Sequence, residues 1–450
     1  MKLTKLKLKN NLNCLIIDEP FYKSIYLSLF VKVGSNDETY GKYKSMKGCT
    51  LGLAHFCEHL LFTGTKKRND KGEIYDTAQS LGGRLNAYTA NDHTKYYLQY
   101  PKKYEKNAIE LLSDMYFCSN FNNDSFKGEK NIVNEEYKQR LDDPEIYLDD
   151  IKYIINFKGC KYETSTPDIL EKCTNQYTKK QLLDFYYHYY IPENCYLVYC
   201  GKKDSTTIPT IEKLFGKEWP NLSCASYDVS KQSIESYKNK WFPNINYPKH
   251  SESPNFLKKI LPNAEYYYFK RNVSKSYFNI TFPNDFHFKS LKDISCAKLF
   301  ALCTSGYMSS RLMKKLRVDS SLIYGIDSDI ILYKKIKNFP ATCFSILSST
   351  DTNTLNKVIQ KLVDELIIIK KNGFTNKEIE SAKNYALANL TYALEYIDEI
   401  VDYYGVNKIT NNKMYSVEDK IKSVNSVTKK DINDFAKMIL DFDNVKFLHI

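Results

Sequence analysis

The sequence predicts an α+β protein made of two homologous domains, each a mainly antiparallel sheet with helices packed on one face. Two observations lead to this prediction. Segments with a strand pattern are followed by long amphipathic helical segments, which favours sheets covered by helices. A similar order also occurs before and after a polar, proline-containing stretch, which indicates a diverged duplication. We expect a first domain over residues 1–222, a linker over 223–263 and a second domain over 264–450.

The first domain is expected to begin with strands. Leu3, Leu6 and Leu8 alternate roughly with lysines, "KNNLN" predicts a turn, and "CLII" predicts a buried second strand. "IYLSLFVKVGSNDE" has the pattern of a further strand that ends in a turn, and "GLAHFCEHLLFTG" has the pattern of a helix. In the second domain, "SYFNITFP" is the expected counterpart of that strand.

Composition limits the class of protein. With 450 residues, of which 43% are hydrophobic, the chain can form sizeable cores. No run of about 18 apolar residues occurs and the N-terminus lacks the apolar core of a signal peptide, so we expect no membrane span and a cytoplasmic or other intracellular location. The twelve cysteines contain no C-x-x-C pair and are expected to be reduced thiols.

The net charge of +12 suggests nucleic-acid binding as one alternative function. The 65 basic and 53 acidic residues are, however, interspersed along the whole chain without a basic arm. We therefore interpret the charge as a solvated surface. A nucleic-acid-binding protein would instead show a basic stripe and strongly salt-dependent binding.

Two histidines and a glutamate lie within five positions of "AHFCEHLLFTGT", in a chain with seven histidines. His55 and His59 are four residues apart, so on a helix both imidazoles can reach one ion. Glu58 falls beside such an ion and can take a proton from water. The pattern predicts a metal site, and the alternative is a packed or exposed histidine pair. Cys57 within the motif is interpreted as a small buried helix residue.

A catalytic zinc usually has three protein ligands, so a carboxylate from another segment is needed. "GEKNIVNEEYKQRLDDP" contains Glu129 and Glu136, which are two turns apart on one face of a predicted helix. The spacing predicts that one of them binds the metal while the other supports it.

These residues resemble the pitrilysin and insulin-degrading-enzyme family of inverted zincins, whose zinc-site helix carries H-x-x-E-H. "GGRLNAYTANDHTKYY" is similar to the family's Gly-Gly-x-x-Asn-Ala-x-Thr strand, and "EKNIVNEEYKQRLDDP" resembles its third-ligand helix. In the second half, "GYMSSRLMKKLRVDSSLIYGI" and "NKEIESAKNYALANL" resemble two further family segments. The resemblance spans nearly the whole chain and is to the short, two-domain class that includes mitochondrial processing peptidase and small bacterial peptidases.

The resemblance implies a zinc endopeptidase that hydrolyses peptides or unfolded segments in an enclosed chamber. His55, His59 and Glu136 would bind one zinc per chain, Glu58 would be the general base, and Glu129 would orient a ligand. The main alternative is a non-catalytic structural member of the same fold, and the intact set of ligands argues against it.

Further substrate-binding roles follow from the same resemblance. Arg317 and Tyr324 would hydrogen-bond the substrate backbone or the developing oxyanion, and the alternative for Arg317 is a surface ion pair. The segment that would add to a substrate strand by edge pairing consists of Asn86, Ala87, Tyr88 and Thr89. The alternative for this segment is an ordinary edge strand.

The resemblance also implies that one chain forms half of a clamshell chamber. We therefore expect a homodimer or a heterodimer with a related chain, with peptides as substrates. No specific nucleic acid is expected as a partner.

Overall fold

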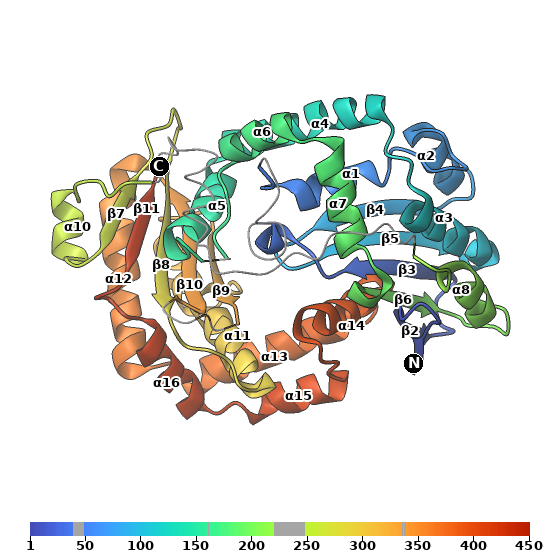
Figure 1. Cartoon of the computed structure of the whole chain (residues 1–450). Helices are drawn as coiled ribbons and strands as arrows, with labels where there is room; N and C mark the ends of the chain where they lie inside the picture. Colours follow the sequence, from blue (N-terminus) through green and yellow to red (C-terminus); the bar gives the residue numbers. More distant parts are fainter. Residues whose placement is uncertain (39–48, 161, 220–247, 335, 337–338) are drawn as a thin grey trace. The chain divides into compact units, whose positions relative to one another are not determined.

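The computed structural model describes residues 1–450 except 39–48, 161, 220–247, 335 and 337–338, and the chain forms two compact units (Figure 1). The first unit comprises Met1–Lys138, Pro167–Pro243 and Tyr392–Tyr415, and the second comprises Gln139–Thr166, Asn244–Thr391 and Ser416–Ile450. The units are therefore interleaved, whereas the sequence predicts consecutive domains over 1–222 and 264–450. The stretches that cross over are 139–166 and 392–415.

The first unit contains a six-stranded sheet in which every pair of strands is antiparallel except β2 and β6. Strand β4 lies at one edge and pairs with β5. In spatial order, the strands are β1 (Lys2–Lys7), β2 (Asn13–Asp18), β6 (Cys195–Gly201), β3 (Ser24–Val31), β5 (Thr94–Pro101) and β4 (Arg84–Thr89).

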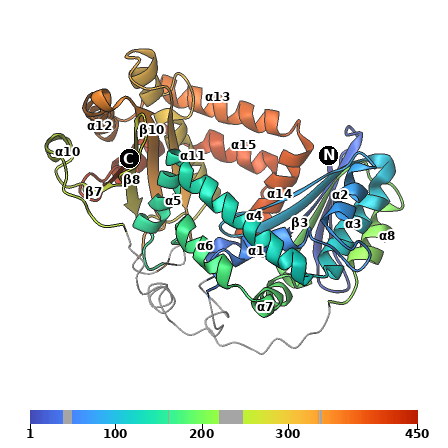
Figure 2. The ribbon, with the colours of Figure 1, turned by 90° about the horizontal axis from the view of Figure 1, so that it is seen from above.

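The second unit contains a five-stranded sheet, and Figure 2 shows β7, β8 and β10 of this sheet beside helices α11 and α12. In spatial order, the strands are β7 (Glu265–Tyr268), β11 (Lys446–His449), β8 (Ser276–Asn284), β10 (Thr342–Thr350) and β9 (Ile326–Leu332). When β2–β6 of the first sheet and β7–β11 of the second are each numbered 1 to 5 along the chain, both sheets have the spatial order 1-5-2-4-3. The parallel pair is β2 and β6 in the first sheet and β7 and β11 in the second. The shared topology agrees with a duplication, and β8 is the counterpart of β3, as the sequence predicts.

The helices complete the α+β class that the sequence predicts. Those of the first unit are α1 (Leu53–Leu60), α2 (Lys71–Gln79), α3 (Glu105–Cys118), most of α4 (Asn123–Asp142), α6 (Pro167–Gln176), α7 (Lys179–Tyr189), α8 (Thr207–Phe215) and α14 (Ile397–Asn411). Those of the second unit are α5 (Pro144–Asn156), α10 (Asn255–Ile260), α11 (Leu291–Ser305), α12 (Leu355–Asn372), most of α13 (Asn376–Ala393), α15 (Val417–Ser426), α16 (Lys429–Ile439) and a π-helix over Met313–Val318. Among the described residues, no helix is both long and apolar enough to cross a membrane.

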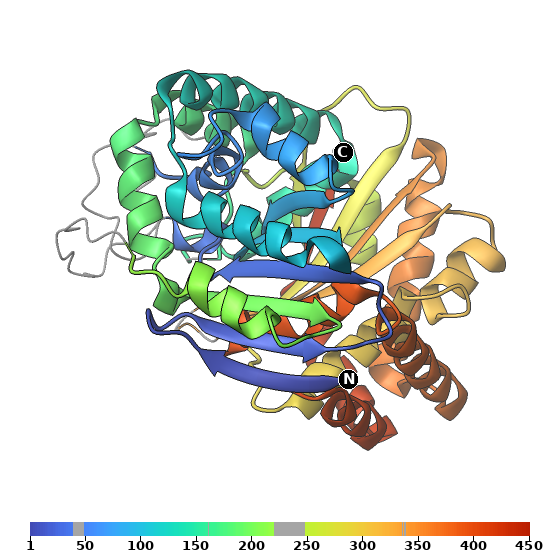
Figure 3. The same ribbon diagram turned by 90° about the vertical axis from the view of Figure 1, so that its right-hand side faces the viewer.

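The first sheet carries helices on both faces, whereas the sequence predicts helices on one face only. Neighbouring side chains of a strand point to opposite faces. On β5, Tyr96 packs against Phe62, which follows α1, while Tyr97 packs in the cluster formed by Val401 and Tyr404 of α14. Figure 3 shows this sheet from the side on which α3 and α8 lie. Helix α14 belongs to the crossing stretch 392–415, which therefore covers the second face.

The second sheet has the same arrangement. Phe278 and Ile280 of β8 lie in the core that α11, α12 and α16 complete, whereas Tyr277 packs against the cluster that contains Leu148 and Ile151 of α5. Helix α5 belongs to the other crossing stretch, 139–166. Each crossing stretch thus supplies the helix that closes the second face of a sheet.

Part of the predicted linker 223–263 is structured. Its residues 223–247 lie outside the described residues, but the remainder contains α10. Leu257 of this helix is fully buried in the core of the second unit. This end of the predicted linker is therefore part of the second unit.

The start of helix α1 is held by a buried carboxylate. Gly52 precedes the helix with φ of 82°, a left-handed conformation that favours glycine, and an added Cβ would lie 2.7 Å from the Tyr137 hydroxyl. The Glu38 carboxylate accepts hydrogen bonds from the backbone N–H groups of Gly52 and Ala54, at 2.6 and 2.8 Å. Burial raises the pKa of Glu38 to about 8, although these hydrogen bonds oppose the rise.

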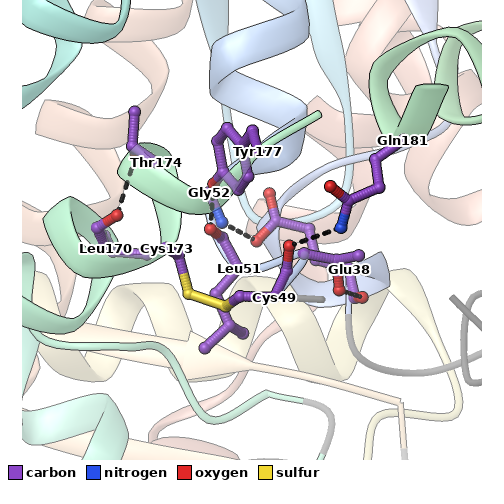
Figure 4. Close-up of a disulfide and its surroundings, with 10 residues drawn as sticks. Glu38, Cys49, Leu51, Gly52, Leu170, Cys173, Thr174, Tyr177 and Gln181 are labelled. Atoms are coloured by element: carbon purple, nitrogen blue, oxygen red, sulfur yellow. Dashed lines mark hydrogen bonds between the residues drawn. A yellow bond between two sulfur atoms is a disulfide. The ribbon is translucent and has the colours of Figure 1, made fainter. Parts of the chain in front are cut away.

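A disulfide joins the segment before α1 to helix α6 (Figure 4). Cys49 and Cys173 are bonded, with Cα atoms 5.3 Å apart, so the prediction of reduced thiols is wrong for this pair. The nine other described cysteines are free. The Tyr177 hydroxyl donates to the Leu51 carbonyl, and the Gln181 amide donates to the Cys49 carbonyl at 3.2 Å. No local spacing shows this pairing, because the two cysteines are 124 positions apart.

Removing the disulfide is expected to destabilise the first unit. Serine at both Cys49 and Cys173 opens a loop of 124 positions, and loss of a native disulfide typically costs about 2–5 kcal/mol. In urea without reductant, the double variant should unfold at a lower midpoint than the wild type. Cys118→Ser, at a partly exposed free cysteine of the same unit, is the control and should unfold like the wild type.

A dithiol reductant should lower the wild-type midpoint to that of the double variant and leave the variant unchanged. A wild-type midpoint that is the same with and without reductant would contradict the disulfide.

Candidate metal centre and active site

Helices α1 and α4 bring three metal-binding side chains together. His55 and His59 lie one turn apart on α1, with their Nε2 atoms separated by 3.2 Å. The Glu136 Oε2 atom of α4 lies 3.4 Å from Nε2 of His55 and 3.5 Å from Nε2 of His59. Among the described residues, these three form the one cluster of histidine, cysteine or acidic side chains with the spacing of a metal site.

The three distances fit a tetrahedral zinc ion. For zinc–ligand distances of about 2.0–2.1 Å, neighbouring ligand atoms of a tetrahedral site lie about 3.3–3.4 Å apart. The observed separations of 3.2, 3.4 and 3.5 Å are close to this value. Two imidazole nitrogens and one carboxylate oxygen are also a donor set that catalytic zinc sites use.

Glu129 lies behind His59. Its Oε2 atom is 3.0 Å from Nδ1 of His59, on the side of the ring away from His55 and Glu136. Burial acts to lower the pKa of His59, but the hydrogen bonds to Glu129 and Glu136 outweigh it and raise the pKa to about 9. The pocket therefore favours a positive charge at the point where the three side chains meet.

Glu58 is buried beside the cluster with its carboxylate held by a threonine. The Thr89 hydroxyl donates to its Oε2 atom at 2.7 Å. Burial raises the pKa of Glu58 to about 7, while the hydrogen bond from Thr89 and the charge of His59 partly oppose the rise. Thr89 is predicted to contact a substrate strand, and its contact with Glu58 is an addition that the sequence does not reveal.

A pocket of about 470 Å³ opens over these residues. One wall is the edge strand β4, whose other side pairs with β5. The complete lining is His55, Glu58, His59, Phe62, Lys71, Tyr75, Asn86, Ala87, Tyr88, Thr89, Ile132 and Glu136. The predicted metal ligands, the predicted base and the predicted substrate strand therefore meet in one pocket of the first unit.

Sequence reasoning missed four residues of this pocket. Phe62 and Tyr75 stack with ring centroids 5.9 Å apart, and Ile132 of α4 faces the same space. Lys71 begins helix α2, and its ammonium forms an ion pair with Glu129 at 2.8 Å. Lys71 lies on α2, whereas Glu129 lies on α4 and His59 on α1. The residue spacing within the H-x-x-E-H motif therefore gives no signal for Lys71.

Arg317 and Tyr324 lie in the second unit. The Arg317 guanidinium is stacked over the Tyr324 ring, with 4.7 Å from Cζ to the ring centroid, and Tyr324 is 81% exposed. Arg317 forms no ion pair with any described residue. The two residues are thus adjacent, and their contact with substrate stays a prediction.

Cys57 is fully buried within α1, as the sequence predicts. Burial raises the pKa of its thiol to about 12, which keeps it protonated and unreactive at neutral pH. Its position in the motif is therefore explained by packing.

Comparison with protein families gives two adjoining matches. Residues 14–157 match the family model described as insulinase (peptidase family M16), and residues 176–385 match the model described as the M16 inactive domain. An uncharacterised zinc protease of Bacillus subtilis, YmxG, is 23% identical over 441 residues, which cover 97% of this chain and 95% of the relative. The A-factor-processing enzyme of Saccharomyces cerevisiae is 32% identical over 210 residues, which cover 45% of this chain and 20% of that enzyme.

Solved structures share the fold over the whole chain. A protease from Helicobacter pylori has a TM-score of 0.79 at 19% identity and covers 100% of this chain and 99% of its own. The periplasmic protease PqqL of Escherichia coli has a TM-score of 0.70 at 17% identity, and this chain corresponds to 47% of its length. With the family models matching both halves, the chain belongs to the insulinase family of peptidases, family M16.

Proposed function

We propose that this protein is a zinc-dependent endopeptidase that hydrolyses peptides or unfolded segments. The observation that carries the proposal is the near-tetrahedral spacing of His55, His59 and Glu136 with the Glu58 carboxylate in the same pocket. A non-catalytic member of the fold would have no need to keep both the ligands and the base.

In this proposal, His55, His59 and Glu136 hold the zinc. The chemistry that zinc supplies at such a site is Lewis acidity, which acidifies water and polarises a carbonyl group. The Glu58 carboxylate accepts the proton of the attacking water and returns it to the leaving amine. Thr89 donates to one oxygen of Glu58 and leaves the other oxygen for the proton.

The substrate is proposed to add to the edge of β4 that faces away from β5. Asn86, Ala87, Tyr88 and Thr89 line the pocket, and the backbone of an edge strand can pair with an extended peptide. This mode recognises backbone more than side chains, so it suits peptides of varied sequence. Arg317 and Tyr324 of a second copy of the chain are proposed to contact the same substrate.

The purified protein is expected to contain about one zinc per chain, because three protein ligands usually retain the metal. His59→Ala removes a ligand and should abolish zinc binding, as measured by elemental analysis. His93→Ala, at a buried histidine that is no part of the cluster, is the control and should keep the zinc. Near-stoichiometric zinc in His59→Ala would rule out the ligand assignment.

Glu58→Gln is expected to keep the fold and the zinc but to lose peptide hydrolysis by several orders of magnitude, because only the proton acceptor is removed. Glu136→Gln should instead weaken zinc binding. Cleavage of a mixed peptide library, followed by mass spectrometry, measures the activity and maps the cleavage sites. If Glu58→Gln retained more than about a tenth of the wild-type kcat, Glu58 would not be the general base.

The working unit is proposed to contain two such chains, as a homodimer or as a heterodimer with a related chain. This chain corresponds to 47% of the length of PqqL, so that protease is about twice as long as this chain. A dimer would supply the equivalent of that second half.

Mixing inactive Glu58→Gln chains with inactive Arg317→Ala chains should restore part of the activity if each site combines residues of two chains. The mixed dimer then has one site with an intact Glu58 and an intact Arg317. Each variant alone is the control. A protein that is monomeric by light scattering, yet fully active on long peptides, would contradict the proposed assembly.

A further inference from the structure

Lys71 is linked to the candidate metal centre through Glu129. Its Nζ atom lies 2.8 Å from Oε1 of Glu129, and the other oxygen of the same carboxylate lies 3.0 Å from Nδ1 of His59. The Glu129 side chain is only 5% exposed, so water has little access to replace either partner. Each oxygen of the carboxylate is therefore held by one side chain.

The backbone that carries Lys71 is fixed by two side-chain hydrogen bonds at the start of helix α2. The Asp70 side chain accepts a hydrogen bond from the Glu73 N–H at 3.0 Å. The Glu73 carboxylate accepts a hydrogen bond from the N–H of Asn69, the residue before Asp70, at 2.7 Å. These two contacts fix the first turn of the helix on either side of Lys71.

The preceding turn is anchored to helix α3. The Arg68 guanidinium pairs with Asp114 at 2.5 Å and with Glu110 at 2.7 Å, and its Nε–H donates to Thr77 of α2 at 3.1 Å. Arg68 is only 13% exposed, so these ion pairs are little weakened by solvent. Lys71 thus projects from a rigid base toward Glu129.

We propose that Lys71 is a positioning residue of the metal centre. By holding Oε1 of Glu129, it keeps Oε2 on Nδ1 of His59, and the ring then presents Nε2 toward His55 and Glu136. A carboxylate without this partner can rotate about its side-chain torsions and lose the alignment with the ring. Mutation of a side chain that hydrogen-bonds a ligand histidine typically lowers metal affinity by about 10–100-fold. The inference rests on the zinc site of the proposed function.

Lys71 also lines the pocket, and its side chain is 42% exposed. A direct contact with a substrate carboxylate is therefore the competing role for this ammonium. The two roles differ in what they change: a positioning residue changes zinc affinity without substrate, whereas a substrate contact changes KM alone.

The test is zinc affinity of the full chain, measured by competition with a chromophoric chelator after the metal has been removed. Lys71→Met should raise the zinc Kd by about tenfold, and Lys71→Arg, which keeps a cation for Glu129, should stay near the wild type. Lys67→Met is the matched control. Lys67 lies beside Arg68 in the segment before α2, pairs with Glu110 and is not in contact with Glu129. It should bind zinc like the wild type.

A double-mutant cycle identifies the route of the effect. If Lys71 acts through Glu129, Lys71→Met should add nothing to the zinc Kd of Glu129→Gln. Full additivity, or a wild-type zinc Kd in Lys71→Met, would overturn the proposal. A raised KM for peptide with unchanged zinc Kd and kcat would assign Lys71 to the substrate instead.

The outcomes separate this inference from the function on which it rests. A wild-type chain that binds zinc while Lys71→Met behaves identically overturns only the role of Lys71. A wild-type chain that binds no zinc overturns the proposed function and this inference together. Melting curves of all variants show whether a change in affinity follows from unfolding.

Discussion

The candidate site depends on the contact between helices α1 and α4. His55 and His59 can converge on one ion because they are one helical turn apart, but the third ligand and the support for His59 both come from α4. Glu129 and Glu136 are two turns apart, so one helix delivers a carboxylate to each side of the His59 ring. A shift of α4 by one residue would rotate both carboxylates away from α1.

The charges around this contact suit a cation. The hydrogen bond to His59 lowers the pKa of Glu136. Glu129 is paired with His59 and Lys71, and these contacts lower its pKa in spite of burial. Glu58 adds a third carboxylate to the same small region. Clustered carboxylates repel one another unless positive charge lies between them. Lys71 supplies part of this charge, and a divalent ion bound at the candidate site would supply the rest.

The scaffold that holds this site is closed on both faces of each sheet. Helix α14 covers the second face of the first sheet, and α5 covers the second face of the other. Both helices come from stretches that cross between the units, so each unit needs residues from both halves of the chain to complete its core. The disulfide and the buried Glu38 add local restraint at the start of α1.

The sequence by itself determined the α+β class, the repeated order of strands and helices along the chain, and the histidine pair of the metal-type cluster. These features depend on short-range spacing: two residues for a strand, and three or four for a helix such as α1. Glu129 and Glu136 were identified as a pair for the same reason, but their separate positions around His59 were decided by the packing of α4. The interleaving of the units, the Cys49–Cys173 bond and the placement of Lys71 were decided by the tertiary structure alone. Each of them joins segments that are distant along the chain, where no local period links one residue to its partner.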